Sequence, residues 1–174
     1  MPALPVIIAP DSRLKAKCRP VDRVDDDIRD LMDDLLESMH AANGIGLSAP
    51  QVGVHWRVIV VEAPAEEGAR QPLFMANPEI VWKSDQVLAS DEGCLSLPDH
   101  YAEVTRPERI TVRYLDRDGT LRELEADGLR AVCIQHEMDH LDGVLFVDHL
   151  SMLKRNIILR KLAKSKKLKE ESDI

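Results

Sequence analysis

The chain has 174 residues, of which 44% are hydrophobic and 31% charged, and this composition is typical of one soluble globular domain. Its formal net charge of −8 at pH 7 argues against nucleic-acid binding by the body of the protein. Three cysteines are too few for a disulfide framework, no apolar run is long enough for a membrane span, and no basic segment precedes the first apolar residues as in a signal peptide. We therefore expect a single-domain cytoplasmic protein.

The first predicted element is an amphipathic helix over residues 24–44. Its apolar residues recur at the i, i+3, i+4, i+7 spacing of one helix face. Aspartates crowd its first turn, where the helix dipole favours negative charge, and Asn43 with Gly44 predicts its end. The apolar stripe, which we interpret as core, consists of Ile28, Leu31, Met32, Leu35, Leu36 and Met39.

Strands are predicted to follow this helix. Residues with branched Cβ atoms indicate a strand over 57–63, and a shorter strand is expected over 78–86. Residues 109–128 alternate in polarity around an Arg-Asp-Gly turn, which predicts a β-hairpin. Two segments that contain proline, 64–72 and 98–108, are expected to be loops.

Two more helices are predicted in the last third of the chain. One covers residues 127–143, with Asp127 as a candidate N-cap and Gly143 as a stop residue. The other runs from Ser151 to the end of the sequence. The order of helix, strands, helix and helix predicts an α+β fold with an antiparallel sheet.

The helix predicted over 127–143 carries two histidines four residues apart, with a glutamate directly after the first. Each helical residue advances by about 100°, so His136, Glu137 and His140 lie within about one third of the circumference. Two imidazoles at this spacing can hold one metal ion, and the glutamate can then reach a water molecule without being a ligand. The alternative interpretation is a solvated helix surface that happens to contain His and Glu.

A catalytic metal site with three protein ligands needs one more donor. Cys94 is a candidate because it lies between Gly93 and Ser96, in a turn or at a strand end, where a thiolate can project into a cleft. The alternative for a lone cysteine is a small core residue. Composition and spacing do not choose between Cys94 and three downstream residues, Asp142, Asp148 and His149.

Residues 43–53 contain two glycines one residue apart, which allow another group to approach the backbone closely. This segment is not a dinucleotide-binding loop, because it follows a helix and no phosphate-binding helix opens after it. Gln51 has an uncharged amide that can donate a hydrogen bond to a developing oxyanion. The alternative is a tight turn with a glutamine on the surface.

Three short segments together resemble the signature motifs of the peptide deformylase family. They are GIGLSAPQ at 44–51, EGCLS at 92–96 and QHEMDH at 135–140, in that order along the chain. The resemblance implies a single compact α+β domain in which antiparallel and mixed strands pack around a central metal-binding helix. It further implies a catalytic domain over 1–150, with a basic C-terminal helix and tail over 151–174 as part of the same domain.

The resemblance also implies roles for individual residues. Cys94, His136 and His140 match the ligands of one divalent metal ion, which would be Fe²⁺ in the cell, with Zn²⁺, Ni²⁺ or Co²⁺ as alternatives in purified protein. Glu137 matches the general acid and base of the family. The oxyanion would receive hydrogen bonds from Gln51 and from the backbone N–H of Leu95.

The implied substrate is the N-formyl group of formylmethionine on nascent bacterial or organellar polypeptides, which is released as formate. Ile45 and Gly46 match residues that line the substrate cleft, and Glu92 and Arg106 match residues that support the site from behind. An apolar pocket for the methionine side chain is expected to involve Ile45, Leu129, Val132 and Cys133, for which ordinary core packing is the alternative.

Two positions depart from the family pattern. Ser48 stands where many relatives have alanine. Tyr101 stands seven residues after Cys94, where many bacterial relatives have arginine. Neither change removes a reacting group, but Tyr101 is expected to alter how the rim of the site recognises its substrate.

The C-terminal segment reverses the charge of the chain, with eight basic residues between 154 and 169 and no acidic residue before Glu170. Leu150, Leu153 and Ile157 are predicted to dock this helix on the body. A basic exposed face favours a polyanionic partner, and the family resemblance suggests ribosomal RNA rather than DNA or a membrane. A solvated helix end is the alternative.

Two rival hypotheses remain at the level of the sequence. A zinc endopeptidase would explain the two histidines and the glutamate but would leave the segment around Cys94 unexplained. A non-catalytic module stabilised by a metal and bound to ribosomes would normally need a fourth protein ligand. Hydrolytic turnover separates both from a deformylase.

Overall fold

The computed structural model describes residues 3–64 and 71–172, so most of the loop expected over 64–72 lies outside the described residues. The elements are η1 (Ser12–Lys15), α1 (Asp26–Ala41), β1 (Gly46–Ser48), η2 (Ala49–Val52), β2 (Val58–Val61), β3 (Leu73–Lys83), β4 (Val87–Cys94), β5 (Leu97–Pro107), β6 (Arg109–Leu115), β7 (Leu121–Asp127), α2 (Gly128–Leu141), η3 (Phe146–His149) and α3 (Met152–Ser172).

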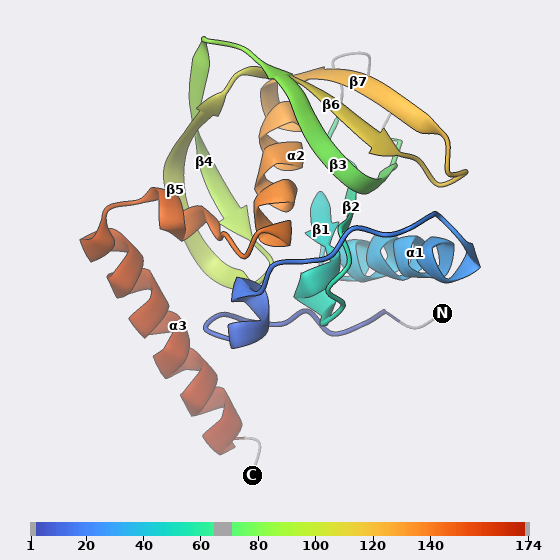
Figure 1. The fold of residues 1–174 in the computed structure, drawn as a ribbon. Coiled ribbons are helices and arrows are strands. Elements are labelled where there is room, and N and C mark those ends of the chain that lie inside the picture. Colours follow the sequence, from blue (N-terminus) through green and yellow to red (C-terminus); the bar gives the residue numbers. More distant parts are fainter. Residues whose placement is uncertain (1–2, 65–70, 173–174) are drawn as a thin grey trace.

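Two antiparallel sheets enclose the helix α2. The larger sheet has five strands in the order β1-β2-β3-β6-β7, and the smaller sheet is the hairpin β4-β5. Figure 1 shows α2 running down the middle of the molecule between the two sheets, and α2 contacts β1, β2, β7 and β5. The predicted α+β fold with antiparallel strands around a central helix is therefore confirmed.

Helix α2 is buried on nearly all sides, which explains why its apolar residues form no single stripe. Nine of its residues are buried, and four of these, Gln135, His136, Glu137 and His140, are polar or charged. A helix placed between two sheets must present apolar residues in every direction. The polar residues that it buries therefore need partners from other elements.

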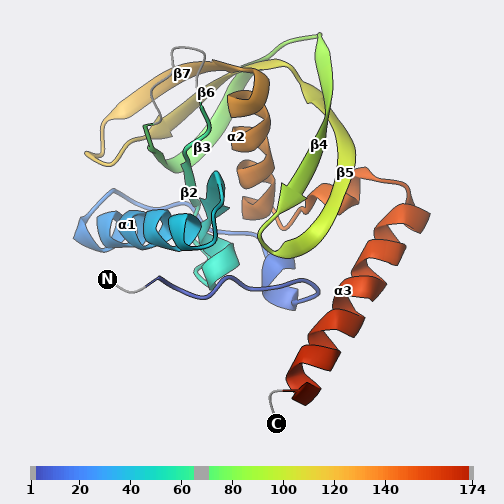
Figure 2. The same ribbon diagram turned by 180° about the vertical axis from the view of Figure 1, so that it is seen from behind.

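The predicted helix over 24–44 is α1, which packs against β1 and β2 (Figure 2). The Asp25 carboxylate accepts a hydrogen bond from the backbone N–H of Ile28 at 3.0 Å and caps the first turn. Ile28, Leu31 and Met32 belong to the buried core, as the helical spacing predicts. This cap and stripe orient α1 so that the chain re-enters the core at β1.

The predicted hairpin over 109–128 is formed by β6 and β7. Its strands pair from Arg109 with Asp127 to Leu115 with Leu121. In the turn, the Asp116 carboxylate accepts hydrogen bonds from two backbone N–H groups, and Gly119 has a φ of 79°. The polarity pattern and the turn residues therefore predict this part of the sheet correctly.

The prediction of a loop over 98–108 is wrong, because these residues form most of β5. Strand β5 pairs with β4 from Val87 with Pro107 to Gly93 with Tyr101. Both prolines of β5 lie near its ends, where a missing N–H costs little in a two-stranded sheet. Strand β4, which no sequence pattern indicated, carries Cys94 as its last residue.

The predicted C-terminal helix exists, and Leu150 packs against the core as expected, but the rest of the docking face differs from the expected one. Leu153 is 72% exposed and Ile157 42% exposed, whereas Leu162 is 2% exposed and packs with Ile158 and Leu159 against the core. In the part of the chain that the structure describes, no helix has the length and apolar character needed to cross a membrane.

Candidate active site

Three candidate metal ligands meet between the two sheets. Cys94 ends β4, at a shift in the register of the β4–β5 ladder, and its Sγ lies 3.4 Å from Nε2 of His140. His136 and His140 stand on α2, with ring centroids 5.1 Å apart. One ligand atom from each of the three residues falls within 4.8 Å of the others. Strand β4 thus brings a sulfur donor to two imidazoles on the central helix.

The other candidates for the third ligand lie elsewhere. Asp142 pairs with Arg57 at 2.9 Å. Asp148 pairs with Lys15 and Arg155, and His149 pairs with Asp139. Each of these side chains is therefore engaged in an ion pair outside the cluster, and the geometry favours Cys94.

The residues of this cluster fit a divalent metal ion. A thiolate and two imidazoles are donors that Zn²⁺, Fe²⁺, Co²⁺ and Ni²⁺ accept. Burial lowers the pKa of His140 well below its usual range, which keeps the ring in the neutral form that binds a metal. Among the described residues, Nδ1 of His140 and Oε1 of Glu137 are buried polar atoms without a hydrogen-bond partner. A cluster of one sulfur and two imidazole donors beside an unpaired carboxylate oxygen suits an added cation.

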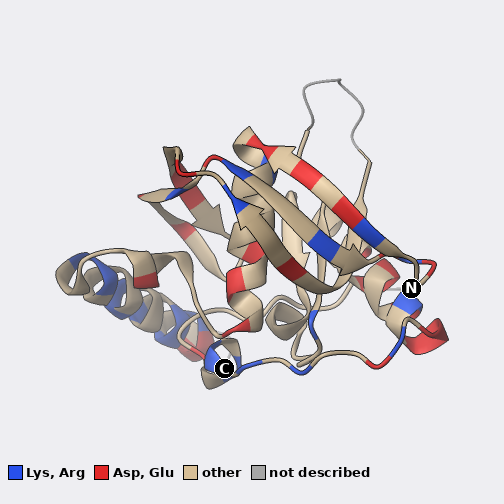
Figure 3. Cartoon of the chain, turned by 45° about the horizontal axis from the view of Figure 1, so that its top comes forward, with Lys and Arg blue, Asp and Glu red and all other residues tan. Residues whose placement is uncertain are grey.

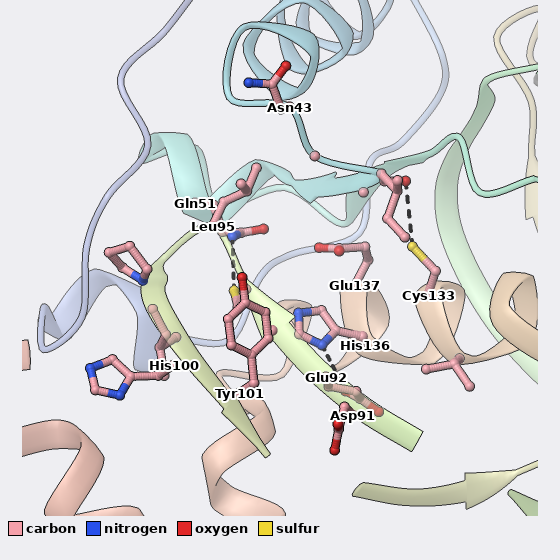
Figure 4. A pocket seen from close by; sticks show the side chains of 18 of the residues that line it. Asn43, Gln51, Asp91, Glu92, Leu95, His100, Tyr101, Cys133, His136 and Glu137 are labelled. Atoms are coloured by element: carbon pink, nitrogen blue, oxygen red, sulfur yellow. Dashed lines mark hydrogen bonds and ion pairs between the residues drawn. The ribbon is translucent and has the colours of Figure 1, made fainter. Parts of the chain in front are cut away.

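His136 is held from behind by a buried ion pair. Its Nδ1–H donates to Oε1 of Glu92 at 3.0 Å, and Glu92 receives two further hydrogen bonds from Arg106 at 2.6 and 2.9 Å. Both Glu92 and Arg106 are only 5% exposed. This support orients the imidazole so that Nε2 faces the cluster (Figure 4).

The Glu92 carboxylate stays ionised in this setting. Burial raises its pKa, but the hydrogen bonds from His136 and Arg106 outweigh burial, and the pKa falls to about 2. An ionised carboxylate can only accept hydrogen bonds, so the His136 ring must carry its proton on Nδ1. The second guanidinium arm of Arg106 donates to Asp139 at 2.9 Å and anchors the pair to α2.

Glu137 points into the same space but has a different environment. It is 4% exposed, and burial raises its pKa to about 7, against the opposing influence of His136. A carboxyl group with a pKa near neutrality can both take up and release a proton. Its side chain lies next to Gly46, where an added Cβ would sit 2.6 Å from Oε2 of Glu137 and 2.9 Å from Sγ of Cys133. Only glycine at position 46 leaves room for the carboxylate.

Gln51 approaches the cluster from η2. Its side chain is buried, and Nε2 donates to Oγ of Ser96 at 3.0 Å and to Sγ of Cys94 at 3.5 Å. The interpretation of Gln51 as a surface residue of a tight turn is therefore wrong. The residue after Cys94 is Leu95, which lies beside Gln51 in Figure 4.

A cavity of about 440 Å³ opens beside the cluster. Tyr101, which is 71% exposed, stands at its mouth, and its ring lies against Gly93 of the paired strand. The expected apolar residues Ile45, Leu129, Val132 and Cys133 all line the cavity, together with Gly46 and Glu137.

The sequence interpretation missed one wall of this cavity. Asp91 and the residues from Pro98 to His100 also line it. His100 projects away from His136 in Figure 4, on the other side of Tyr101. This wall was missed because the pairing of β4 with β5 was not predicted. Strand β4 carries Cys94, and its partner strand β5 runs along the same cavity.

Known proteins resemble this chain over nearly its whole length. A sequence model described as polypeptide deformylase matches residues 3–156. A peptide deformylase of Methylocella silvestris is 53% identical over 171 residues, which cover 97% of this chain and 87% of the relative. A peptide deformylase of Alkalilimnicola ehrlichii is 57% identical over 164 residues, which cover 94% of this chain and 91% of the relative.

Solved structures give the same result. The crystal structure of peptide deformylase from Ehrlichia chaffeensis superposes with a TM-score of 0.91 at 38% identity, covering 97% of this chain and 99% of the other. The same protein in complex with actinonin superposes with a TM-score of 0.90 at 41% identity, covering 95% and 98%. The similarity thus extends over the sheets, the central helix and the C-terminal helix alike.

Proposed function

The chain belongs to the polypeptide deformylase family, and from that membership we propose that the cluster of Cys94, His136 and His140 beside Glu137 is its active site. The protein is a metal-dependent hydrolase that removes the N-formyl group from the formylmethionine of nascent polypeptides and releases formate. The observation that carries the assignment of the site is the meeting of three donor atoms within 4.8 Å next to a buried carboxylate.

In this proposal Cys94, His136 and His140 hold one divalent ion. When bound, such an ion supplies Lewis-acid chemistry, because it polarises a carbonyl oxygen and lowers the pKa of water. The support for this ligand set is the compact mixed group of one sulfur and two nitrogen donors. We propose Fe²⁺ as the ion in the cell, with Zn²⁺, Ni²⁺ or Co²⁺ as substitutes in purified protein, and metal analysis after anaerobic purification tests this choice.

Glu137 is proposed as the general base and acid. It accepts the proton of the attacking water while the oxygen of that water bonds to the formyl carbon. It then returns a proton to the departing amine, so that formate and a free N-terminal methionine result. A pKa of about 7 supports both halves of this role, because the carboxyl group exchanges its proton easily near neutral pH.

The negative charge that develops on the formyl oxygen is proposed to meet two hydrogen-bond donors. One is Nε2 of Gln51, which already lies on the cluster side, 3.5 Å from Sγ of Cys94. The other is the backbone N–H of Leu95, which directly follows Cys94 at the end of β4. Donors that are fixed before the reaction stabilise the transition state without a cost of reorganisation.

The cavity of about 440 Å³ is proposed to take the methionine side chain. Ile45, Leu129 and Val132 supply apolar surface, and Gly46 leaves room beside it for the Glu137 carboxylate. Tyr101, at the mouth, is proposed to contact the residues after methionine through its ring. A phenol in place of a guanidinium favours apolar and aromatic neighbours over acidic ones.

The basic C-terminal helix is proposed to contact the ribosome. We propose a catalytic domain over 1–150 to which residues 151–174 add a helix that meets the ribosome. Figure 3 shows Lys and Arg gathered along α3, while Asp and Glu lie at the C-terminal end of that helix and over the other elements. Lys161, Lys164 and Lys167 are exposed, and an exposed row of cations suits a polyanionic surface such as ribosomal RNA.

Formate release from a short N-formyl-methionyl peptide tests the proposed site. We expect chelator-sensitive release by anaerobically purified protein, and loss of that release when Cys94 is changed to Ser while the fold is kept. The matched control is Cys18→Ser, which changes a buried cysteine outside the cavity. Equal formate release and equal metal content in Cys94→Ser would exclude Cys94 from the site.

A further inference from the structure

The hydroxyl of Ser48 is buried and donates a hydrogen bond to Gln51. Ser48 is the last residue of β1 and is 0% exposed. Its Oγ–H donates to Oε1 of Gln51 at 2.9 Å, and its backbone N–H donates to the same oxygen at 3.0 Å. One residue therefore supplies two donors to one end of the Gln51 carboxamide.

The other end of the carboxamide faces the metal cluster. Nε2 of Gln51 lies 3.0 Å from Oγ of Ser96 and 3.5 Å from Sγ of Cys94. If the carboxamide were turned over, Nε2 would face the N–H of Ser48, and Oε1 would face the Cys94 sulfur. Two donors would then oppose each other in a buried place, which is costly.

We propose that Ser48 is a positioning residue of the deformylase reaction. Its hydroxyl, together with its N–H, fixes Gln51 so that the donor Nε2, and not the acceptor Oε1, meets the formyl oxygen. This inference rests on the proposed role of Gln51 as an oxyanion donor. An acceptor in that place would repel the developing negative charge instead of stabilising it.

The hydroxyl adds to what the backbone N–H alone can do. The hydroxyl and the N–H are two separate donors to Oε1, beside the two bonds that Nε2 makes at the other end, and together they hold the plane of the carboxamide more firmly than the N–H alone. A donor to Oε1 also polarises the amide and strengthens the hydrogen bonds that the Nε2 amide group can donate. Alanine at position 48 would keep the backbone donor and remove only the second hydrogen bond.

A double-mutant cycle on Ser48 and Gln51 tests the inference. We expect Gln51→Ala to lower kcat by about 100-fold or more, as loss of an oxyanion donor does elsewhere. Ser48→Ala should lower kcat by about 3- to 10-fold, the value of one ordinary hydrogen bond, with KM unchanged. In the Gln51→Ala background, Ser48→Ala should have no further effect on kcat, because Ser48 acts through Gln51.

Ser38→Ala is the matched control. Ser38 is 1% exposed in α1, and its hydroxyl donates to the backbone oxygen of Asp34 at 2.7 Å, away from the cavity. This variant also removes one buried hydroxyl, so it shows what a loss of stability alone does to kcat. Thermal unfolding and metal content of all variants are measured alongside.

A second readout does not depend on turnover. Hydrogen exchange of the Gln51 side-chain amide, followed by NMR in metal-free protein, should be faster in Ser48→Ala than in the wild type and unchanged in Ser38→Ala. This measurement tests whether Ser48 positions Gln51 even if the wild type releases no formate.

The possible outcomes distinguish a failure of the role of Ser48 from a failure of the role of Gln51. An equal loss of kcat from Ser48→Ala in both backgrounds, or unchanged kcat and unchanged amide exchange, would overturn the role of Ser48. Full kcat in Gln51→Ala would instead overturn the role of Gln51 as oxyanion donor, and with it the catalytic consequence of its positioning.

Discussion

The most consequential single residues of this protein are its buried charges. Glu92 and Arg106 are almost fully buried, and they neutralise each other while they hold the ring of His136. Glu137 lies in the same interior without such a cation, which is why its pKa rises to about 7 while that of Glu92 falls to about 2. The two carboxylates thus differ in pKa because burial of Glu137 is not offset, whereas hydrogen bonds from His136 and Arg106 outweigh the burial of Glu92.

Glu92→Gln should weaken metal binding by about 10- to 100-fold, as changes behind a histidine ligand typically do. A neutral amide can still accept a hydrogen bond from His136, but it no longer balances the buried guanidinium of Arg106. A zinc dissociation constant from competition with a chromophoric chelator measures the effect.

The matched control for this change is Glu123→Gln, which removes a carboxylate from the exposed pair with Arg113. An exposed pair contributes little to stability, so this variant should bind zinc like the wild type. Wild-type zinc affinity in Glu92→Gln would show that the ion pair with Arg106 does not support the metal site.

At the scale of the elements, two carboxylates connect η1 and η3 with the C-terminal helix α3. Asp11 pairs with Arg13 and lies 3.9 Å from Lys166 of α3. Asp148 of η3 bonds both Lys15 and Arg155, and so connects η1 with the start of α3. These contacts join three elements that the hydrophobic core around Leu162 also brings together.

The Asp11 carboxylate makes the stability of the folded state sensitive to acid. The hydrogen bonds from Arg13 lower the pKa of Asp11 from 3.8 to about 2. A carboxyl group whose pKa is lower in the folded state stabilises that state above its unfolded pKa, and this contribution is lost as the pH falls from about 4 to about 2. The free energy of unfolding should therefore decrease over this range.

Urea unfolding at several pH values measures this decrease, and Asp11→Asn should make the dependence shallower. The control is Asp22→Asn, an exposed aspartate for which the wild-type slope should persist. An identical slope in Asp11→Asn and the wild type would show that Asp11 does not contribute.

The elements also show what can be predicted from the sequence. Helix α1 and the hairpin β6–β7 were predicted because their patterns are local: an apolar stripe with a cap, and alternation around a turn. Strands β4 and β5 were not, because most of their residues are exposed or half-buried and prolines stand near both ends of β5. Their pairing depends on packing against η3 and α2, which no local pattern reveals.

The site was predictable in part for the same reason. The spacing of His136 and His140 is visible in the sequence because both stand on one helix. The partnership with Cys94 depends on β4 ending beside α2, so spacing left it open, and only the family resemblance assigned it. The ion pair of Glu92 with Arg106 joins two strands and was not predicted, because the resemblance placed both residues only behind the site.

At the scale of the whole molecule, charge is divided between the body and α3. The chain has a net charge of −8, although its C-terminal helix is strongly basic. Changing Lys161, Lys164 and Lys167 together to Glu should reduce cosedimentation with ribosomes at low salt several-fold and leave formate release from short peptides unchanged. These side chains are exposed, so the change spares the buried contacts of Leu162 that a truncation would remove.

The matched control places Glu at three exposed cations away from α3, Lys17, Arg23 and Lys83. This variant makes the protein more acidic without touching the proposed contact, and it should cosediment like the wild type. Equal loss in both variants would point to overall charge rather than α3, and no loss in either would contradict the ribosome contact.

The central claim is that one metal cluster and one buried carboxylate together perform the deformylation. The most direct measurement follows formate release and bound metal side by side in the wild type and in Glu137→Gln. The amide keeps the shape of the side chain but cannot take up a proton, so we expect unchanged metal content and a loss of kcat of about 100-fold or more. Wild-type turnover in Glu137→Gln with full metal content would contradict the account.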